Sequence, residues 1–233
     1  MLTFTRKRNG FSLVEMMISM VIGSALILLV GDSYIKTTSA IKVLRDIKYL
    51  DGQLNDVASL IVKEIKRAGF INYSVDISER YISQYRYSLS HDNVNYKSPV
   101  VIEDGNKCVR FFYDINKDGC IGSALPNGTG CTLQLNNNPE VVGYKFEKKS
   151  IKSSWANTDS CSGGTWLSMI DNDRINIDDF SIKIKSVDPV ISGDQSTKLF
   201  FPVIELYIKG SVASDSSIKR SVTRTITLEN PML

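Results

Sequence analysis

The chain has 233 residues, of which 42% are apolar, and this is enough material for one globular domain behind an additional N-terminal segment. The formal net charge is +3, and Arg6, Lys7 and Arg8 supply three of the 28 basic residues, which leaves 25 basic and 25 acidic side chains elsewhere. This balance argues against a nucleic-acid-binding protein, so we expect no nucleic acid partner.

The first predicted element is an apolar run from Phe11 to Val30 that contains a single charged residue, Glu15. About twenty helical residues at ~1.5 Å each span a hydrocarbon core of ~30 Å, so we expect a membrane-spanning helix. The basic flank predicts that the N-terminus stays in the cytoplasm and that the rest of the chain is translocated. A secretory signal would have small residues at a cleavage site beyond the run, where this chain has Gly31-Asp32-Ser33-Tyr34.

A basic leader ends in Gly10, and Phe11 and then Glu15 follow it, so that the segment reads GFSLVEMM. This pattern resembles the type IV pilin signal, also called the type III signal. The resemblance implies that a prepilin peptidase cuts after Gly10 and that the new amino terminus of Phe11 is methylated. It also implies that Glu15 neutralises the terminal amine of a neighbouring subunit during assembly. The alternative is that Glu15, about one helical turn from Phe11, reaches the headgroup region or is protonated.

A helical pattern continues beyond the membrane segment. Apolar residues recur at alternating spacings of three and four: Val43, Ile47, Leu50, Leu54, Val57, Ile61, Ile65 and Ala68. Polar residues occupy mostly the other faces: Lys42, Asp46, Lys48, Asp51, Asn55, Lys63, Glu64 and Lys66. This pattern predicts an amphipathic helix packed against a domain. Gly69 is suited to a left-handed cap, so we expect one helix from Phe11 to Ala68.

A long N-terminal helix, half in lipid and half packed on a globular head, is the type IV pilin architecture. The segment Leu60–Phe70 has a basic residue, Ala and Gly before an aromatic residue, and it resembles the helix end of PilW-type minor pilins. The resemblance implies a cleaved leader (1–10), a membrane-spanning half (11–31), an amphipathic half (32–69) and a periplasmic β-rich head (70–233). The protein would then cross the inner membrane once before it enters a fibre.

After Phe70 the sequence changes to runs of β-branched and aromatic residues separated by clusters of Gly, Asn, Asp and Ser. The expected strands are Tyr81–Leu89, Lys107–Asp114, Val141–Lys148, Phe180–Ser186, Lys198–Lys209 and Ile218–Leu228. No crossover helix is evident between them, so we expect antiparallel pairing. The predicted class is α+β, with the long helix packed on an antiparallel sheet.

All four cysteines lie beyond the membrane segment, and an even number on the exported side predicts two disulfides in an oxidising periplasm. There is no CxxC pair and His91 is the only histidine, so a zinc site is poorly supported. Of the three possible pairings we favour Cys120–Cys131, which closes a short loop, together with Cys108–Cys161, which ties two strands together.

The segment from Asp114 to Cys120 resembles the first half of a calcium loop. Asp114, Asn116 and Asp118 stand at alternate positions, a glycine is sixth, and the carbonyl of Cys120 is available at the seventh. The twelfth position is Leu125 where a calcium loop has Glu, and Asp and Asn also favour plain turns. A calcium site and a hairpin turn both remain open, with the turn favoured, and we expect no other cofactor.

The sequence has one histidine and no GxSxG, Walker or Rossmann signature, so we expect no enzymatic activity. The leading hypothesis is a minor pilin that primes or caps type IV pilus assembly in a tip complex. Its N-terminal helix would contact other minor pilins and the major pilin. One alternative is a J-class pseudopilin of type II secretion or of a DNA-uptake apparatus. The other is a membrane-anchored periplasmic binding or enzymatic domain that never polymerises.

Overall fold

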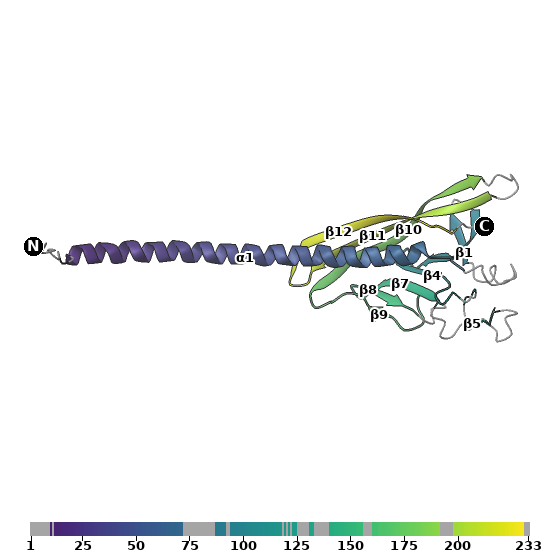
Figure 1. Cartoon of the computed structure of the whole chain (residues 1–233), viewed down its shortest axis with the longest axis horizontal. Helices are drawn as coiled ribbons and strands as arrows, with labels where there is room; N and C mark the ends of the chain where they lie inside the picture. The colour runs from purple at the N-terminus through teal and green to yellow at the C-terminus, as the bar shows by residue number, and fades with distance from the viewer. Residues whose placement is uncertain are drawn as a thin grey trace, which may run out of the picture. The chain divides into compact units, whose positions relative to one another are not determined.

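The computed structural model describes residues 10, 12–71, 87–91, 94–117, 119, 121, 123–124, 131–132, 140–155, 160–191 and 198–230. The chain divides into two compact units, Met1–Asp46 and Ile47–Leu233. Helix α1 (Leu13–Lys66) belongs to both units, and the strands belong to the second (Figure 1).

The first unit consists of the N-terminal part of α1. The carbonyl of Ser12 accepts a hydrogen bond from the amide of Met16 at 3.1 Å, so Ser12 directly precedes the first helical turn. From Leu13 to Val30 the large apolar side chains are exposed on every face of the helix. By length and composition this is the one helix among the described residues that could cross a membrane.

In the second unit α1 buries one stripe of side chains. Leu50, Leu54, Ile61 and Ile65 are fully buried, as the predicted stripe requires, whereas Val43 lies before this unit and is 43% exposed. α1 is continuous to Lys66 and a turn then follows. The predicted helix end is therefore correct to within two residues.

Gly69 terminates the helix in the left-handed conformation that the sequence predicts, with φ +78°. Its amide donates to the carbonyl of Phe112 at 2.7 Å, and a Cβ at this position would lie 2.9 Å from Pro99. The side-chain amide of Asn230 donates to the carbonyl of Ala68 at 2.8 Å. The end of α1 is thus closed by a strand and by the C-terminal part of the chain.

Within the described ranges the strands form four antiparallel sheets. The larger sheet has the order β3-β4-β7-β8-β9, from Val100–Glu103, Cys108–Phe112, Val141–Glu147, Ser150–Ser154 and Leu167–Ser168. The second has the order β10-β11-β12, from Ile175–Ile191, Lys198–Val212 and Asp215–Thr227. Two hairpins complete the set: β1 (Tyr87–His91) with β2 (Val94–Ser98), and β5 (Ser123–Ala124) with β6 (Cys131–Thr132).

The antiparallel prediction is confirmed, and β4, β7, β10, β11 and β12 match predicted strands. The predicted strand Tyr81–Leu89 coincides with β1 only from Tyr87, because its first six residues lie outside the described ranges. The prediction omitted β3 and β8 because each is only four or five residues long. Both belong to hairpins whose turns have positive φ: Asp104 and Asn106 before β4, and Lys148 and Lys149 before β8.

The tips of these two hairpins join the sheets. The carbonyl of Asn106 accepts a hydrogen bond from the amide of Ile182 in β10 at 2.8 Å. The carbonyl of Lys149 accepts one from Ile177 of the same strand, also at 2.8 Å. The outer edge of β10 therefore bonds to the larger sheet, and α1 packs into one core formed by both sheets. Gly210 of β11 permits the close approach of α1 to this strand, because a Cβ at position 210 would lie 3.2 Å from the side chain of Leu54.

Candidate processing and assembly site

The N-terminal motif extends into the first turn of α1, which begins at Leu13. Gly10 is exposed, Phe11 lies outside the described residues, and Glu15 is an exposed residue of the first helical turn. A carboxylate there is favoured by the partial positive charge of a helix N-terminus. Of these residues the structure places Gly10 three positions before the start of α1 and Glu15 in the first turn of that helix.

The apolar surface around Glu15 is continuous. The side chains of Leu13, Val14, Met16 and Met17 are between 60% and 76% exposed. In a membrane, acyl chains or other apolar helices pack against such a surface. A carboxylate within it requires a cationic partner or protonation.

A buried polar contact between Glu64 and Tyr113 joins the last turns of α1 to the strands of the second unit. Glu64 is 7% exposed although the sequence placed it among polar residues that face mostly outward, so this position was predicted wrongly. Its carboxylate accepts a hydrogen bond from the hydroxyl of Tyr113, and its other oxygen lies 3.7 Å from the guanidinium of Arg67. Arg67 also lies over the Tyr113 ring at 5.8 Å. The burial of Glu64 could have been predicted from its spacing, because Glu64 lies three residues after Ile61 and therefore on the same side of the helix as the apolar stripe.

The surroundings of Tyr113 change its acidity. Burial and the neighbouring Glu64 carboxylate raise the pKa of Tyr113 to about 12. Burial also raises the pKa of Tyr144, with Glu64 and Tyr113 adding to the effect. Both hydroxyls therefore stay protonated in the folded head well above neutral pH.

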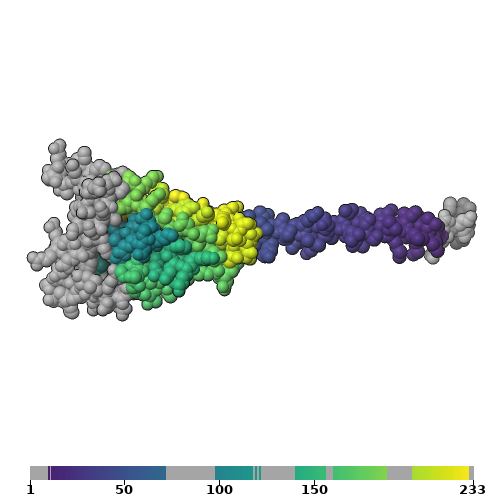
Figure 2. Space-filling model, turned by 180° about the vertical axis from the view of Figure 1, so that it is seen from behind, coloured from purple at the N-terminus to yellow at the C-terminus, as the bar shows by residue number. Residues whose placement is uncertain are grey.

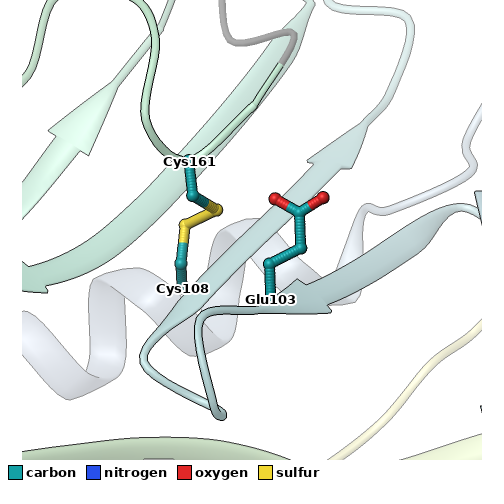
Figure 3. Close-up of side chains that lie close together, drawn as sticks. All are labelled: Glu103, Cys108 and Cys161. Atoms are coloured by element: carbon teal, nitrogen blue, oxygen red, sulfur yellow. A yellow bond between two sulfur atoms is a disulfide. The ribbon is translucent and has the colours of Figure 1, made fainter.

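The predicted disulfide Cys108–Cys161 is present, with the two Cα atoms 6.2 Å apart (Figure 3). It holds the loop after β8 against β4, and the carbonyl of Cys161 accepts a hydrogen bond from Lys145 of β7 at 3.2 Å. Glu103 lies beside the sulfurs, and its carboxylate pairs with Arg110 at 2.6 Å. Among the described residues this is the one group with metal-binding spacing, but its two cysteines are joined to each other. The predicted pair Cys120–Cys131 remains a prediction, because Cys120 lies outside the described residues.

The Asp114 segment forms a turn in the part that the structure describes. Asp114 is buried, and its carboxylate accepts a hydrogen bond from the amide of Gly119 at 2.9 Å. Glu140, which the sequence did not single out, accepts one from the amide of Ile115 at 3.1 Å. Of the other predicted calcium ligands, Asn116 is exposed, and Asp118 and Cys120 lie outside the described ranges. The Asp114 carboxylate thus closes the described part of this turn through the Gly119 amide.

Comparison with known proteins identifies one motif and one family in this chain. The prokaryotic N-terminal methylation motif matches residues 5–31. The family described as prepilin peptidase-dependent protein B matches residues 45–228, which is most of the chain. A type IV-like pilin from Thermus thermophilus superposes with a TM-score of 0.39 at 10% identity, covering 77% of this chain and 96% of that chain.

A protein of Haemophilus influenzae described as uncharacterized is 28% identical over 153 residues. The match covers 55% of this chain and 63% of that protein, so the chain spans less than two thirds of the relative's length. The motif lies within the first unit, and the family match runs from residue 45, near the end of that unit, to residue 228 and includes the strands of the second unit. The chain therefore belongs to the prepilin peptidase-dependent protein B family, and it is a type IV pilin-like protein with a prepilin signal.

Proposed function

We propose that this protein is a minor pilin that primes or caps a type IV pilus as part of a tip complex with other minor pilins. The observation that carries the proposal is the continuity of α1. The helix begins at Leu13, just after the predicted cleavage site at Gly10–Phe11, and one stripe of side chains on its last five turns is buried in the core of a β-rich head. A processed apolar helix attached to a folded head is suited to a structural subunit rather than to an enzyme.

The proposed membrane topology follows from charge and length. Arg6, Lys7 and Arg8 hold the leader on the cytoplasmic side, the apolar part of α1 spans the inner membrane, and the head lies in the periplasm. Prepilin peptidase then acts at Gly10, and the methylated Phe11 remains at the membrane until assembly. In the fibre, the exposed apolar surface of α1 packs against the helices of the major pilin and of other minor pilins.

Glu15 has the central role in this assembly step. Its carboxylate pairs with the terminal amine of a neighbouring subunit as both helices leave the lipid. Removing one partner leaves the other charge uncompensated in a low-dielectric environment, which is costly. The tip position itself is supported by the resemblance of the Leu60–Phe70 segment to PilW-type minor pilins.

The experiment compares Glu15→Val with Ser19→Ala, a matched control one helical turn further on, in a strain lacking the chromosomal copy. We expect both variants to be inserted and cleaved, and only Glu15→Val to be missing from sheared surface fibres. Incorporation of Glu15→Val at the wild-type level would contradict the proposed role of Glu15. Loss of secretion or DNA uptake with normal piliation in the deletion strain would favour the pseudopilin alternative.

For the Asp114 segment we propose a turn that folds without metal. We expect the melting temperature of the wild-type protein to be the same in millimolar calcium and in chelator. A calcium-dependent increase that disappears in Asp118→Ala would instead assign a calcium site to this loop.

A further inference from the structure

The strands of the larger sheet place a carboxylate next to the two cysteines of the Cys108–Cys161 pair. Glu103 of β3 lies directly opposite Cys108 of β4 in the register of the sheet, so the two side chains are on the same face. In Figure 2 the teal surface of β3 and β4 adjoins the green surface of the later strands of this sheet. The close-up in Figure 3 shows the Glu103 carboxylate beside the sulfurs, and one carboxylate oxygen and the two sulfurs all lie within 4.8 Å of one another.

In the thiol form these three side chains offer a ligand set for a metal ion. Two thiolates and one carboxylate suit a borderline-soft divalent ion such as Zn²⁺. Zn–S bonds of ~2.3 Å in a tetrahedral site place the two sulfurs ~3.8 Å apart. This separation is within the 4.8 Å over which the ligand atoms of the group extend. Three protein ligands leave the fourth position to a water molecule.

The surroundings of Glu103 support a ligand role for its carboxylate. Arg110 donates from Nε to one oxygen at 3.1 Å and from Nη2 to the other at 2.6 Å. Each ionised carboxylate oxygen has a second lone pair, so it can accept these bonds and still coordinate a metal. Zn²⁺ with three anionic ligands carries one net negative charge, which the Arg110 guanidinium balances. Both cysteines are buried, whereas the Glu103 side chain is 32% exposed, so an ion reaches the group from the side of Glu103.

We infer that the head binds one zinc-like divalent ion through Cys108, Cys161 and Glu103 while the two cysteines are thiols. Cysteines enter every chain as thiols, so each chain passes through this form before the disulfide is made. The ion and the disulfide exclude each other, and both link the segment after β8 to β4. The cysteines are 53 positions apart, and for this reason the search for CxxC spacing in the sequence did not reveal the group.

The test uses the full-length chain in detergent with Cys120→Ser and Cys131→Ser, so that the two remaining cysteines are those of the proposed site. A phosphine reductant gives two electrons to the disulfide and takes an oxygen atom from water, which leaves two thiols and the phosphine oxide. Cadmium is the probe, because its bonds to thiolates absorb in the ultraviolet, and zinc is the competitor. We expect one cadmium ion per reduced chain, displaced by zinc, and none on the oxidised chain. Absence of stoichiometric binding, or equal binding by the oxidised chain, would overturn the proposal.

Glu103→Gln in the same chain tests the third ligand. Loss of an outer partner of a metal ligand already weakens binding 10–100-fold, so we expect this variant to lower zinc affinity at least about tenfold. Glu147→Gln is the matched control, because Glu147 is also on this sheet but pairs with Lys152 at 2.7 Å, and it should leave zinc affinity unchanged. Thiols of an unfolded chain would bind metal without Glu103, so equal affinity with and without Glu103→Gln would contradict the site.

Thermal unfolding of the reduced chain with Glu103 intact gives a second measurement, which needs no substitution at the site. Zinc should raise the unfolding temperature of the reduced chain and leave that of the oxidised chain unchanged, because a ligand stabilises the folded state that binds it. An unfolding temperature that zinc does not raise in the reduced chain would contradict a metal site in the folded head.

Discussion

The hydroxyl of Tyr113 donates a hydrogen bond to the carboxylate of Glu64 and so joins the residue after β4 to the last turns of α1. Both side chains are buried, at 4% and 7% exposure. A buried carboxylate is tolerated only where it is hydrogen-bonded or paired, so this contact specifies which face of α1 meets the larger sheet.

Tyr113→Phe tests this contact. The substitution keeps the ring and removes the donor, which leaves the Glu64 carboxylate buried with Arg67 alone. We expect the free energy of unfolding to fall by about 1–3 kcal/mol in urea denaturation of the full chain in detergent. Tyr207→Phe, the same chemical change on β11, is the control and should cost less than about 0.5 kcal/mol. Equal losses from the two substitutions would contradict a specific role for the contact.

The raised pKa of Tyr113 predicts a loss of stability in alkali. Between pH 10, the ordinary value, and about 12, the unfolded chain releases this proton while the folded head retains it. Stability is therefore fully present below pH 10 and falls as pH rises through this window, by an amount on the order of 2 kcal/mol. The difference between wild type and Tyr113→Phe should shrink over the same range. A constant difference up to pH 12 would show that Tyr113 does not carry the effect.

Gly69→Ala should destabilise the end of α1 for two reasons. The left-handed φ disfavours a side chain, and the added Cβ would lie 2.9 Å from Pro99. Gly105→Ala is the control, because Gly105 also has positive φ but has no neighbour within 4 Å of the added Cβ. We expect Gly105→Ala to lower the free energy of unfolding by about 1 kcal/mol through backbone strain alone, and Gly69→Ala to lower it by more, both measured by thermal unfolding. A similar loss of stability in the two variants would contradict a role for the Pro99 contact, because it would mean that Pro99 can move away from the added Cβ at no cost in free energy.

Removal of the Cys108–Cys161 disulfide should lower stability by about 2–5 kcal/mol, because the link closes a long loop and fixes the segment that carries Trp166. The Trp166 indole donates to the carbonyl of Gly163 at 2.6 Å and lies 4.6 Å from the Lys145 ammonium. We expect Cys108→Ala with Cys161→Ala to change Trp166 fluorescence as well as the unfolding midpoint. Unchanged fluorescence would show that the loop holds its position without the link.

Much of this architecture could be predicted from periodicity. The stripe from Ile47 to Ala68 has the helical spacing, and long strands such as β11 have β-branched and aromatic residues in sufficient number to be recognised. The short strands could not be found in this way, because β8 has only five residues and its turn, Lys148-Lys149, lacks glycine or asparagine.

The functional residues likewise fall into two groups: those that a local sequence motif predicts and those that depend on contacts between distant parts of the chain. Gly10, Phe11 and Glu15 could be singled out because the motif is local in sequence. The pairing of Glu64 with Tyr113 and the contact of Glu140 with the Asp114 turn join residues that are 49 and 25 positions apart. Such contacts depend on how the strands are arranged, which a single sequence does not specify.

The most direct test of the central claim is mass spectrometry of the mature N-terminus, purified from membranes of a strain with its prepilin peptidase intact. The account predicts a chain that begins at Phe11 with a methylated amino group, and an uncleaved chain in a peptidase-deficient strain. A chain that retains Met1 in both strains would contradict the proposal that this protein is processed and assembled as a pilin.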